Sequence, residues 1–380
     1  MLTERVEFDP LSEREILSAI PDSPAVFRLR GHDPASDPYI SKTANLRRRL
    51  QRLLGPLTEL TRRLNLRDRV KEIQYTPTGS DFESGFLLYR LLRDSFPKTY
   101  SSRLRFRFAP LVKLHLDNAY PRASVTTRLG GATGKSAYYG PFPSRSAAEK
   151  FASDSLDLFK MRRCVDDLHP DPQFPGCIYS EMKMCLAPCF KGCSDDEYRF
   201  EVERVQAYFD SNGHSLLREI SSQRDHASAT MDFEAAASMH ARLEKIKPVV
   251  NQVSEIVHRI DRLAGVIVQT NSSPLAVTFF KISAGCISGP RTFSIQAPDH
   301  MKSHSMEGRV MEALATMSPH DSMSALATME HLAILKRWYF RSSRVGEIFF
   351  CDDKGTLPMR RLVRGISRVY HGEKEIEHAN

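Results

Sequence analysis

Five of the seven cysteines in this 380-residue chain lie between Cys164 and Cys193. The same stretch contains four prolines, which disfavour regular secondary structure, so it needs an external tie to stay ordered. The charged N-terminus is unlike a secretory signal peptide, and thiols clustered in such a chain are more typical of metal ligation than of disulfides. We therefore predict a metal centre in this segment, with free buried cysteines as the alternative.

A second chemical signal is a local concentration of positive charge. Between Lys42 and Lys113 there are 17 Lys/Arg and 6 Asp/Glu, a balance of +11, whereas the whole chain carries +8 and its remainder therefore −3. The same run includes four aromatic residues after position 95, which could stack on bases or fill a core. A basic face confined to one part of the chain predicts contact with nucleic acid. The alternative is an ordinary solvated surface.

The elements that carry this charge predict a small α/β unit. Residues 25–30 and 38–41 predict two strands joined by a polar turn, and residues 44–54 predict a helix whose leucines share one face. A third strand over 73–78 and a second helix over 82–95 follow. The unit ends near residue 105.

The next elements are a hairpin and a group of helices. Residues 112–128 and 138–142 predict a hairpin with a glycine-rich tip, which lacks the glycine at position 129 that a phosphate-binding loop requires. A helix is predicted from Ser144 to about residue 160. A capping box, Ser194 with Glu197, begins a long helix predicted to reach about residue 224. A further helix over 232–247 turns back along it.

The whole chain is predicted to be α+β, in four parts: 1–105, 106–193, 194–260 and 261–380. Strands beyond Leu263 are followed by helices over 307–316 and 322–340. No apolar run approaches the ~18 residues of a transmembrane helix. We therefore expect a cytoplasmic protein without a membrane partner.

Four fragments, in order along the chain, resemble the N-terminal half of the excinuclease subunit UvrC. They are PAVF at 24–27 with YISK at 39–42 and NLRRRL at 45–50, YYGPFPS at 138–144, the cysteine spacing, and DFEAAASMHARLEKI at 232–246. The first UvrC module is a GIY-YIG nuclease domain. The resemblance thus implies nucleotide excision repair and metal-assisted hydrolysis of DNA phosphodiesters, placed within residues 1–105.

The resemblance assigns the catalytic roles. Tyr39 would help to activate the water, Arg49 would neutralise charge in the transition state, and Lys42 lies beside them. The glutamate that would hold Mg²⁺ falls at Leu88, which cannot bind a hard cation, and Phe27 replaces a tyrosine of the motif. We therefore expect the endonuclease site to be inactive. Arg47, Arg48 and Arg52, on the same predicted helix as Arg49, are the candidate DNA contacts.

The resemblance also implies a cofactor and a protein partner. The four cysteines of the UvrC spacing would hold a [4Fe–4S] cluster; they are Cys164, Cys177, Cys185 and Cys189. Zn²⁺ is the alternative, although zinc sites usually have paired close cysteines and this spacing has only one close pair. The helical hairpin resembles the UVR motif with which UvrC binds UvrB. Its candidate contacts are Phe233, Ala236, Met239 and Leu243, and a self-contained hairpin is the alternative.

Three functions remain open at this point. The first is a UvrC-like repair protein that binds DNA and UvrB with its incision site inactive. The second is an active Mg²⁺-dependent endonuclease of the same class with an unrecognised metal ligand. The third is a metal-binding regulatory protein on the same fold. UvrC continues into an RNase-H-like nuclease and a helix-hairpin-helix region; this chain ends at Asn380, so we expect no second active site.

Overall fold

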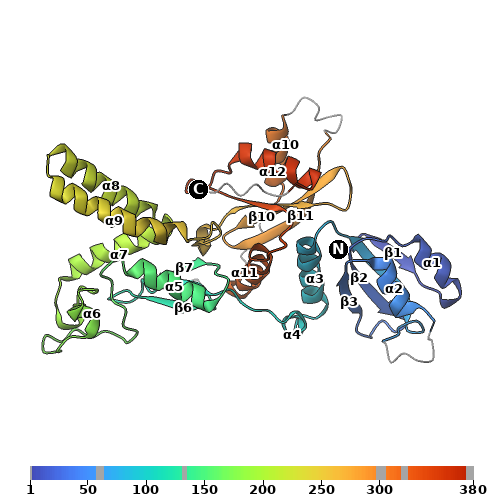
Figure 1. Ribbon diagram of the computed structural model, residues 1–380. Helices are drawn as coiled ribbons and strands as arrows, with labels where there is room; N and C mark the ends of the chain where they lie inside the picture. The colour runs from blue at the N-terminus through green and yellow to red at the C-terminus, as the bar shows by residue number, and fades with distance from the viewer. Residues whose placement is uncertain (1, 57–63, 131–134, 297–304, 318–323, 374–380) are drawn as a thin grey trace.

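The computed structural model describes residues 2–56, 64–130, 135–296, 305–317 and 324–373. Its architecture is α+β, as predicted. Three four-stranded antiparallel sheets follow one another along an extended molecule, and a helical hairpin projects from one end (Figure 1). The middle and last sheets share one hydrophobic core, and the first sheet has its own. Within the described residues, no helix is both long enough and apolar enough to cross a membrane.

The first lobe is built on a sheet of order β1-β4-β2-β3. Its elements are β1 (Glu4–Glu7), a 3-10 turn (Pro10–Ser12), α1 (Glu13–Ala19), β2 (Ala25–Gly31), β3 (Tyr39–Thr43), α2 (Leu46–Leu54) and β4 (Val70–Pro77). Helix α2 begins at Asn45, whose side chain accepts a hydrogen bond from the Arg48 amide at 2.9 Å. Its four leucines are buried against the sheet, as their spacing predicts. The predicted strands and helix of this lobe are therefore confirmed.

Helix α3 (Asp81–Ser95) connects the first lobe with the rest of the molecule (Figure 1). Its aromatic side chains pack away from the first core. The Phe82 and Phe86 rings meet Phe280 edge-on at centroid distances of 4.9 and 5.8 Å. The Tyr89 hydroxyl donates to the buried Glu330 carboxylate at 2.9 Å. Helix α4 (Tyr100–Leu104) follows.

The middle sheet corrects the predicted hairpin. Its order is β6-β5-β7-β8, made of β5 (Leu111–Leu114), β6 (Ala123–Thr126), β7 (Ala137–Gly140) and β8 (His258–Arg259). Strand β5 pairs with both β6 and β7, so the glycine-rich segment joins two strands that are not neighbours. The chain already reverses over 115–122, where the His115 amide donates to the Arg122 carbonyl at 2.9 Å. Residues 131–134 of the predicted tip lie outside the described residues.

The helices after residue 144 are largely as predicted. Ser144 caps α5 (Arg145–Leu156), and two short turns, α6 (Ile178–Glu181) and a 3-10 turn (Pro188–Phe190), lie in the cysteine-rich segment. The Ser194–Glu197 capping box begins α7 (Asp195–Asp210), as expected. The prediction of one long helix to residue 224 is wrong, because α7 ends at Asp210 and the backbone is left-handed at Asn212 and Gly213 before α8 begins. Helices α8 (His214–Ala229) and α9 (Phe233–Asn251) then form the hairpin.

The last lobe is a sheet of order β11-β10-β9-β12 covered by helices (Figure 1). Its elements are a 3-10 turn (Ile260–Arg262), β9 (Gly265–Thr270), β10 (Ala276–Ser283), β11 (Cys286–Ser294), α10 (Met306–Ala315), α11 (Ala325–Tyr339), β12 (Glu347–Phe350) and α12 (Met359–His371). The three strands after Leu263 and the first two helices are confirmed. Strand β12 and helix α12 were not predicted.

Candidate nucleic-acid interface and candidate metal centre

The first lobe brings together two of the three predicted catalytic residues. The Arg49 guanidinium, from α2, donates to the Tyr39 hydroxyl, from β3, at 2.8 Å. The Tyr39 ring lies 6.0 Å from the ring of Phe27, which occupies the position of a motif tyrosine. The Nε atom of Arg49 is buried and has no hydrogen-bond partner among the described residues. The pair therefore has the positive charge and the hydroxyl that the resemblance requires.

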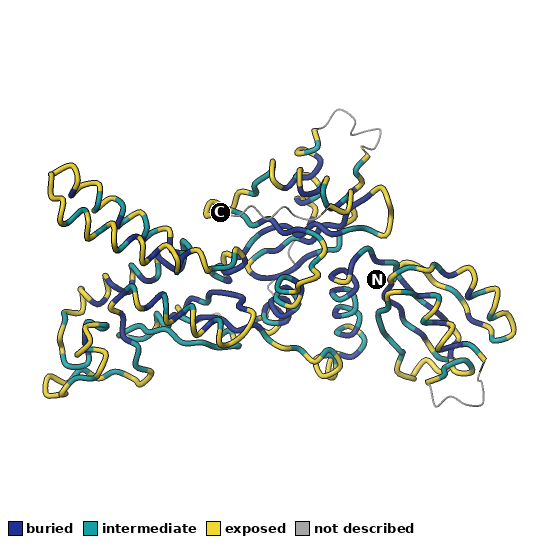
Figure 2. Tube along the Cα trace, viewed as in Figure 1, coloured by how far each residue is buried: buried dark blue, intermediate teal, exposed yellow. Residues whose placement is uncertain are grey.

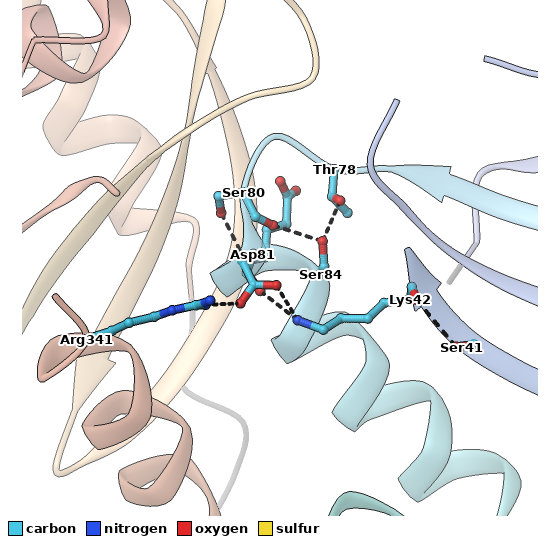
Figure 3. Close-up of polar contacts among 8 residues, drawn as sticks. Ser41, Lys42, Thr78, Ser80, Asp81, Ser84 and Arg341 are labelled. Atoms are coloured by element: carbon cyan, nitrogen blue, oxygen red, sulfur yellow. Dashed lines mark hydrogen bonds and ion pairs between the residues drawn. The ribbon is translucent and has the colours of Figure 1, made fainter. Parts of the chain in front are cut away.

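Lys42, the third predicted residue, faces a different group. Its ammonium donates to the carboxylate of Asp81 at the start of α3, and Arg341 donates to the other oxygen of the same carboxylate at 2.8 Å (Figure 3). Partial burial opposes ionisation of Asp81, but the two cations outweigh it and hold the pKa of the carboxyl below its usual value. This ion triad joins the first lobe to the last.

The position expected to hold a metal is apolar. Leu88 is half-buried on α3 and lines the same cavity as Lys42 and Asp81. Glu83, earlier on the same helix, does not line it: the side chain is only 6% exposed and accepts a hydrogen bond from the Gly79 amide at 2.8 Å. Burial raises the pKa of Glu83 to about 7. Among the described residues, no three His, Cys, Asp or Glu side chains are arranged to hold a metal ion.

The three candidate DNA contacts on α2 differ in accessibility. Arg48 and Arg52 are exposed to solvent. Arg47 is half-buried and its Nε donates to the carbonyl of Ile20 at 2.8 Å, so it contributes to the structure of the lobe. Two cations on one helix are thus free to meet a phosphate backbone.

The four cysteines of the predicted cluster line one small cavity, of about 10 Å³, although 24 residues lie between the first and the last. Cys193 is not part of the lining. The Cys164 sulfur accepts from Arg162 Nη1 and the Cys185 sulfur from the Ala187 amide, both at 3.3 Å. N–H donors to two of the sulfurs suit thiolates. The four thiols do not stand in a metal-binding arrangement here, since no three His, Cys, Asp or Glu side chains of the described residues do.

The candidate partner contacts on α9 are only partly accessible. Phe233 is 70% exposed near the end of the hairpin, where Figure 2 shows mostly exposed chain, and Ala236 is half-buried. Met239 is half-buried against the hydrophobic core that the middle and last sheets share. Leu243 is 2% exposed, so its assignment to partner binding is corrected: the side chain anchors the hairpin to the body.

The sequence reasoning missed one component, a group of cations on the far side of the cavity. Lys336, Arg337, Arg341 and Arg344 come from the end of α11 and the residues after it, and they face the first lobe across α3. The signal is the segment KRWYFRSSR at 336–344, which has four cations and no acid. The segment does not stand out in the sequence because the chain outside 42–113 has a net negative charge.

Comparison with known proteins finds a family model that matches part of the chain. Residues 110–208, from before β5 to α7 and including all four predicted cysteine ligands, match the family described as UvrC/Cho excinuclease, middle domain. No solved structure matches the chain.

Several curated relatives are UvrABC system protein C, and the resemblance to the N-terminal half of UvrC is therefore confirmed. The protein from Alcanivorax borkumensis is 28% identical over 256 residues, covering 67% of this chain and 41% of its own length. The protein from Carboxydothermus hydrogenoformans is 25% identical over 283 residues, covering 74% of this chain and 45% of its own length. The protein from Serratia proteamaculans is 26% identical over 295 residues, covering 76% of this chain and 47% of its own length. The chain thus spans less than half the length of each of these relatives.

Proposed function

We propose that this protein acts in nucleotide excision repair in the cytoplasm as a UvrC-like DNA-binding protein whose GIY-YIG site does not cut DNA. The similarity to UvrABC system protein C supports the repair role. The observation that carries the loss of incision is the lack of a free acid in the cavity that Leu88 and Lys42 line, beside but not including Tyr39 and Arg49. Its one acidic lining residue within the described chain, Asp81, is bound by Lys42 and Arg341, and Leu88 stands where the metal ligand is expected.

A divalent ion would have to displace a cation to reach Asp81. Mg²⁺ prefers carboxylate and water oxygens in near-octahedral geometry, and two cations on the same carboxylate oppose its approach. Tyr39 and Arg49 remain in contact, but neither group supplies a metal ligand. The pair is well suited to bind a phosphate and poorly suited to hydrolyse it.

The cysteines and the helical hairpin complete the proposal. We assign Cys164, Cys177, Cys185 and Cys189 to a bound metal, either a [4Fe–4S] cluster or Zn²⁺, because all four line one cavity. We assign the exposed end of the α8–α9 hairpin, with Phe233 at its tip, to the contact with UvrB. Mg²⁺ is a cofactor only if the nuclease site is active.

DNA binding is tested by reversing charge on α2. Fluorescence anisotropy with a lesion-bearing duplex should show weaker binding by Arg48→Glu/Arg52→Glu than by wild type. The slope of log affinity against log salt should fall by about 1.8, which is about 0.9 for each of two lost phosphate contacts. Duplex affinity equal to that of wild type would contradict the assignment of α2 to DNA.

A further inference from the structure

We propose that the cavity between β3, α3 and α11, here called the basic cleft, binds a single-stranded segment of nucleic acid. This inference rests on the proposed DNA-binding function and adds a second site to it, distinct from the exposed arginines of α2. Those arginines do not line the cleft. The cleft is formed by residues of the first and last lobes, with α3 between them.

The charge of the cleft requires an anionic occupant. Seven cationic side chains line it against one acid, Asp81. Arg105, Arg107 and Arg337 are exposed and form no ion pair with any described residue. Burial, and then the neighbouring charge of Arg107, lower the pKa of Lys336, a sign that cations are crowded here. A chain of phosphates would relieve that crowding at several points together.

The size of the cleft favours one strand over two. Its volume is about 960 Å³. That space can take a few nucleotides of an extended single strand. It is too small for a stretch of B-DNA, whose major groove alone is ~12 Å wide and ~8.5 Å deep.

Apolar and aromatic surface lies among the cations. Phe106 is half-buried and lies between the exposed Arg105 and Arg107 in the sequence. Its ring is stacked on that of Phe108, with the two ring centroids 6.2 Å apart. Leu88 also lines the cleft, whereas Trp338 lines it as a buried residue, with the Arg344 guanidinium 5.5 Å from the centre of its ring. Alternation of cations that follow the backbone with rings on which bases stack is typical of sites for single strands. Leu88, which removes the metal ligand, thus also supplies contact surface for a base.

The two walls are held in place without a ligand. The buried carboxylate of Glu330, on α11, accepts from Tyr89 at 2.9 Å and from Tyr100 at 2.6 Å. Arg90, on α3, donates to the Gly289 carbonyl of the last lobe at 2.9 Å. Lys42 and Arg341 meet on Asp81 across the mouth (Figure 3). A preformed site loses less conformational entropy when a strand binds.

The test uses the single tryptophan of the chain, Trp338, which lines the cleft. Its fluorescence is followed while the full chain is titrated with a short oligothymidylate, and anisotropy of a labelled oligothymidylate reports total binding. The test variant is Arg107→Glu/Arg337→Glu. The matched control, Arg218→Glu/Lys245→Glu, makes the same charge change at exposed positions of the helical hairpin.

Wild type should show saturable quenching of Trp338. In the test variant affinity should fall at least about tenfold and the salt slope by about 1.4, which is about 0.7 for each lost contact to a single strand. The control should stay within twofold of wild type. Arg48→Glu/Arg52→Glu should keep the quenching, since its arginines lie outside the cleft.

Three results would overturn the proposal. They are an absence of oligothymidylate binding, binding with unchanged Trp338 fluorescence, and equal affinity of the test variant and the control. The duplex titration of Arg48→Glu/Arg52→Glu tests the proposed DNA-binding function by itself, so its failure can be told apart from failure of the basic cleft. Far-UV circular dichroism verifies folding, and Arg107→Gln/Arg337→Gln replaces the test variant if charge reversal unfolds the chain.

Discussion

Asp81 decides what the basic cleft can hold. Its carboxylate is shared by Lys42 and Arg341, which come from opposite lobes. Because these cations keep the pKa of Asp81 low, the carboxylate stays ionised and bound across the ordinary pH range. The acid therefore acts as a tie between lobes, whereas Arg105, Arg107 and Arg337 form no ion pair with any described residue.

Glu83 gives a pH-dependent stability. Its pKa rises on folding from 4.5 to about 7, because burial disfavours the ionised form. The contribution of the neutral carboxyl is complete below pH 4.5 and is lost as pH rises through 7, a change of about 3 kcal/mol. We expect Glu83→Gln, which stays neutral, to be more stable than wild type at pH 8 and similar at pH 4.5. Urea unfolding at the two pH values measures this; an equal difference at both would refute it.

The cysteine-rich segment depends on its thiols more than on its own core. It contains short turns, and several of its apolar side chains are exposed, among them Ile178 and Met182. We expect Cys185→Ser to lose bound metal and to lower Tm, because ordering of this segment is coupled to metal binding. Protein purified without oxygen should be brown with iron near four per chain, or colourless with one zinc.

Metal analysis and thermal melting of Cys185→Ser and Cys193→Ser provide the contrast. Cys193 lies outside the cavity that the other four line, so Cys193→Ser should retain the metal. Wild-type protein free of both metals would contradict the assignment.

Two residues of helix α9 have different expected roles, one in stability and the other in partner binding. Leu243 is 2% exposed and Phe233 is 70% exposed. Leu243→Ala should destabilise the chain by about 2–5 kcal/mol through lost burial and a cavity. Phe233→Ala should leave the free energy of unfolding almost unchanged and weaken binding of purified UvrB. Calorimetric titration and denaturant unfolding of both variants measure this, and a Phe233→Ala protein that binds UvrB as wild type does would argue against the hairpin contact.

Local elements of this chain could be predicted because their causes are local. The leucine spacing and the Asn45 cap define α2, and the Ser194–Glu197 box defines the start of α7. The interruption of the helix before Gly213 was missed because the helical pattern resumes at once in α8. The pairing of β5 with two strands depends on a turn at 115–122 that a longer run of apparent strand concealed.

The basic cleft could not be predicted because its walls are distant in sequence. The partners of Phe82, Phe86 and Tyr89 lie about 200 residues further on, in β10 and α11. No periodicity within α3 shows that its aromatic face meets the last lobe. The four cysteines could be predicted to lie together. The resemblance to UvrC identified them, and all four line one cavity.

We propose that the whole molecule combines a positive lobe that binds DNA, a basic cleft and a site without a metal ligand, and one assay tests that combination. Supercoiled and lesion-bearing duplex are incubated with wild-type protein and Mg²⁺ or Mn²⁺, with Tyr39→Phe, Leu88→Glu and Leu88→Glu/Phe27→Tyr alongside. We predict that wild type binds the duplex and does not nick it. Leu88→Glu alone should not reach full activity, since each missing polar contact in such a site costs about 10²–10³ in rate. Metal-dependent nicking by wild type that disappears in Tyr39→Phe would contradict the account, because another residue would then have to hold the metal.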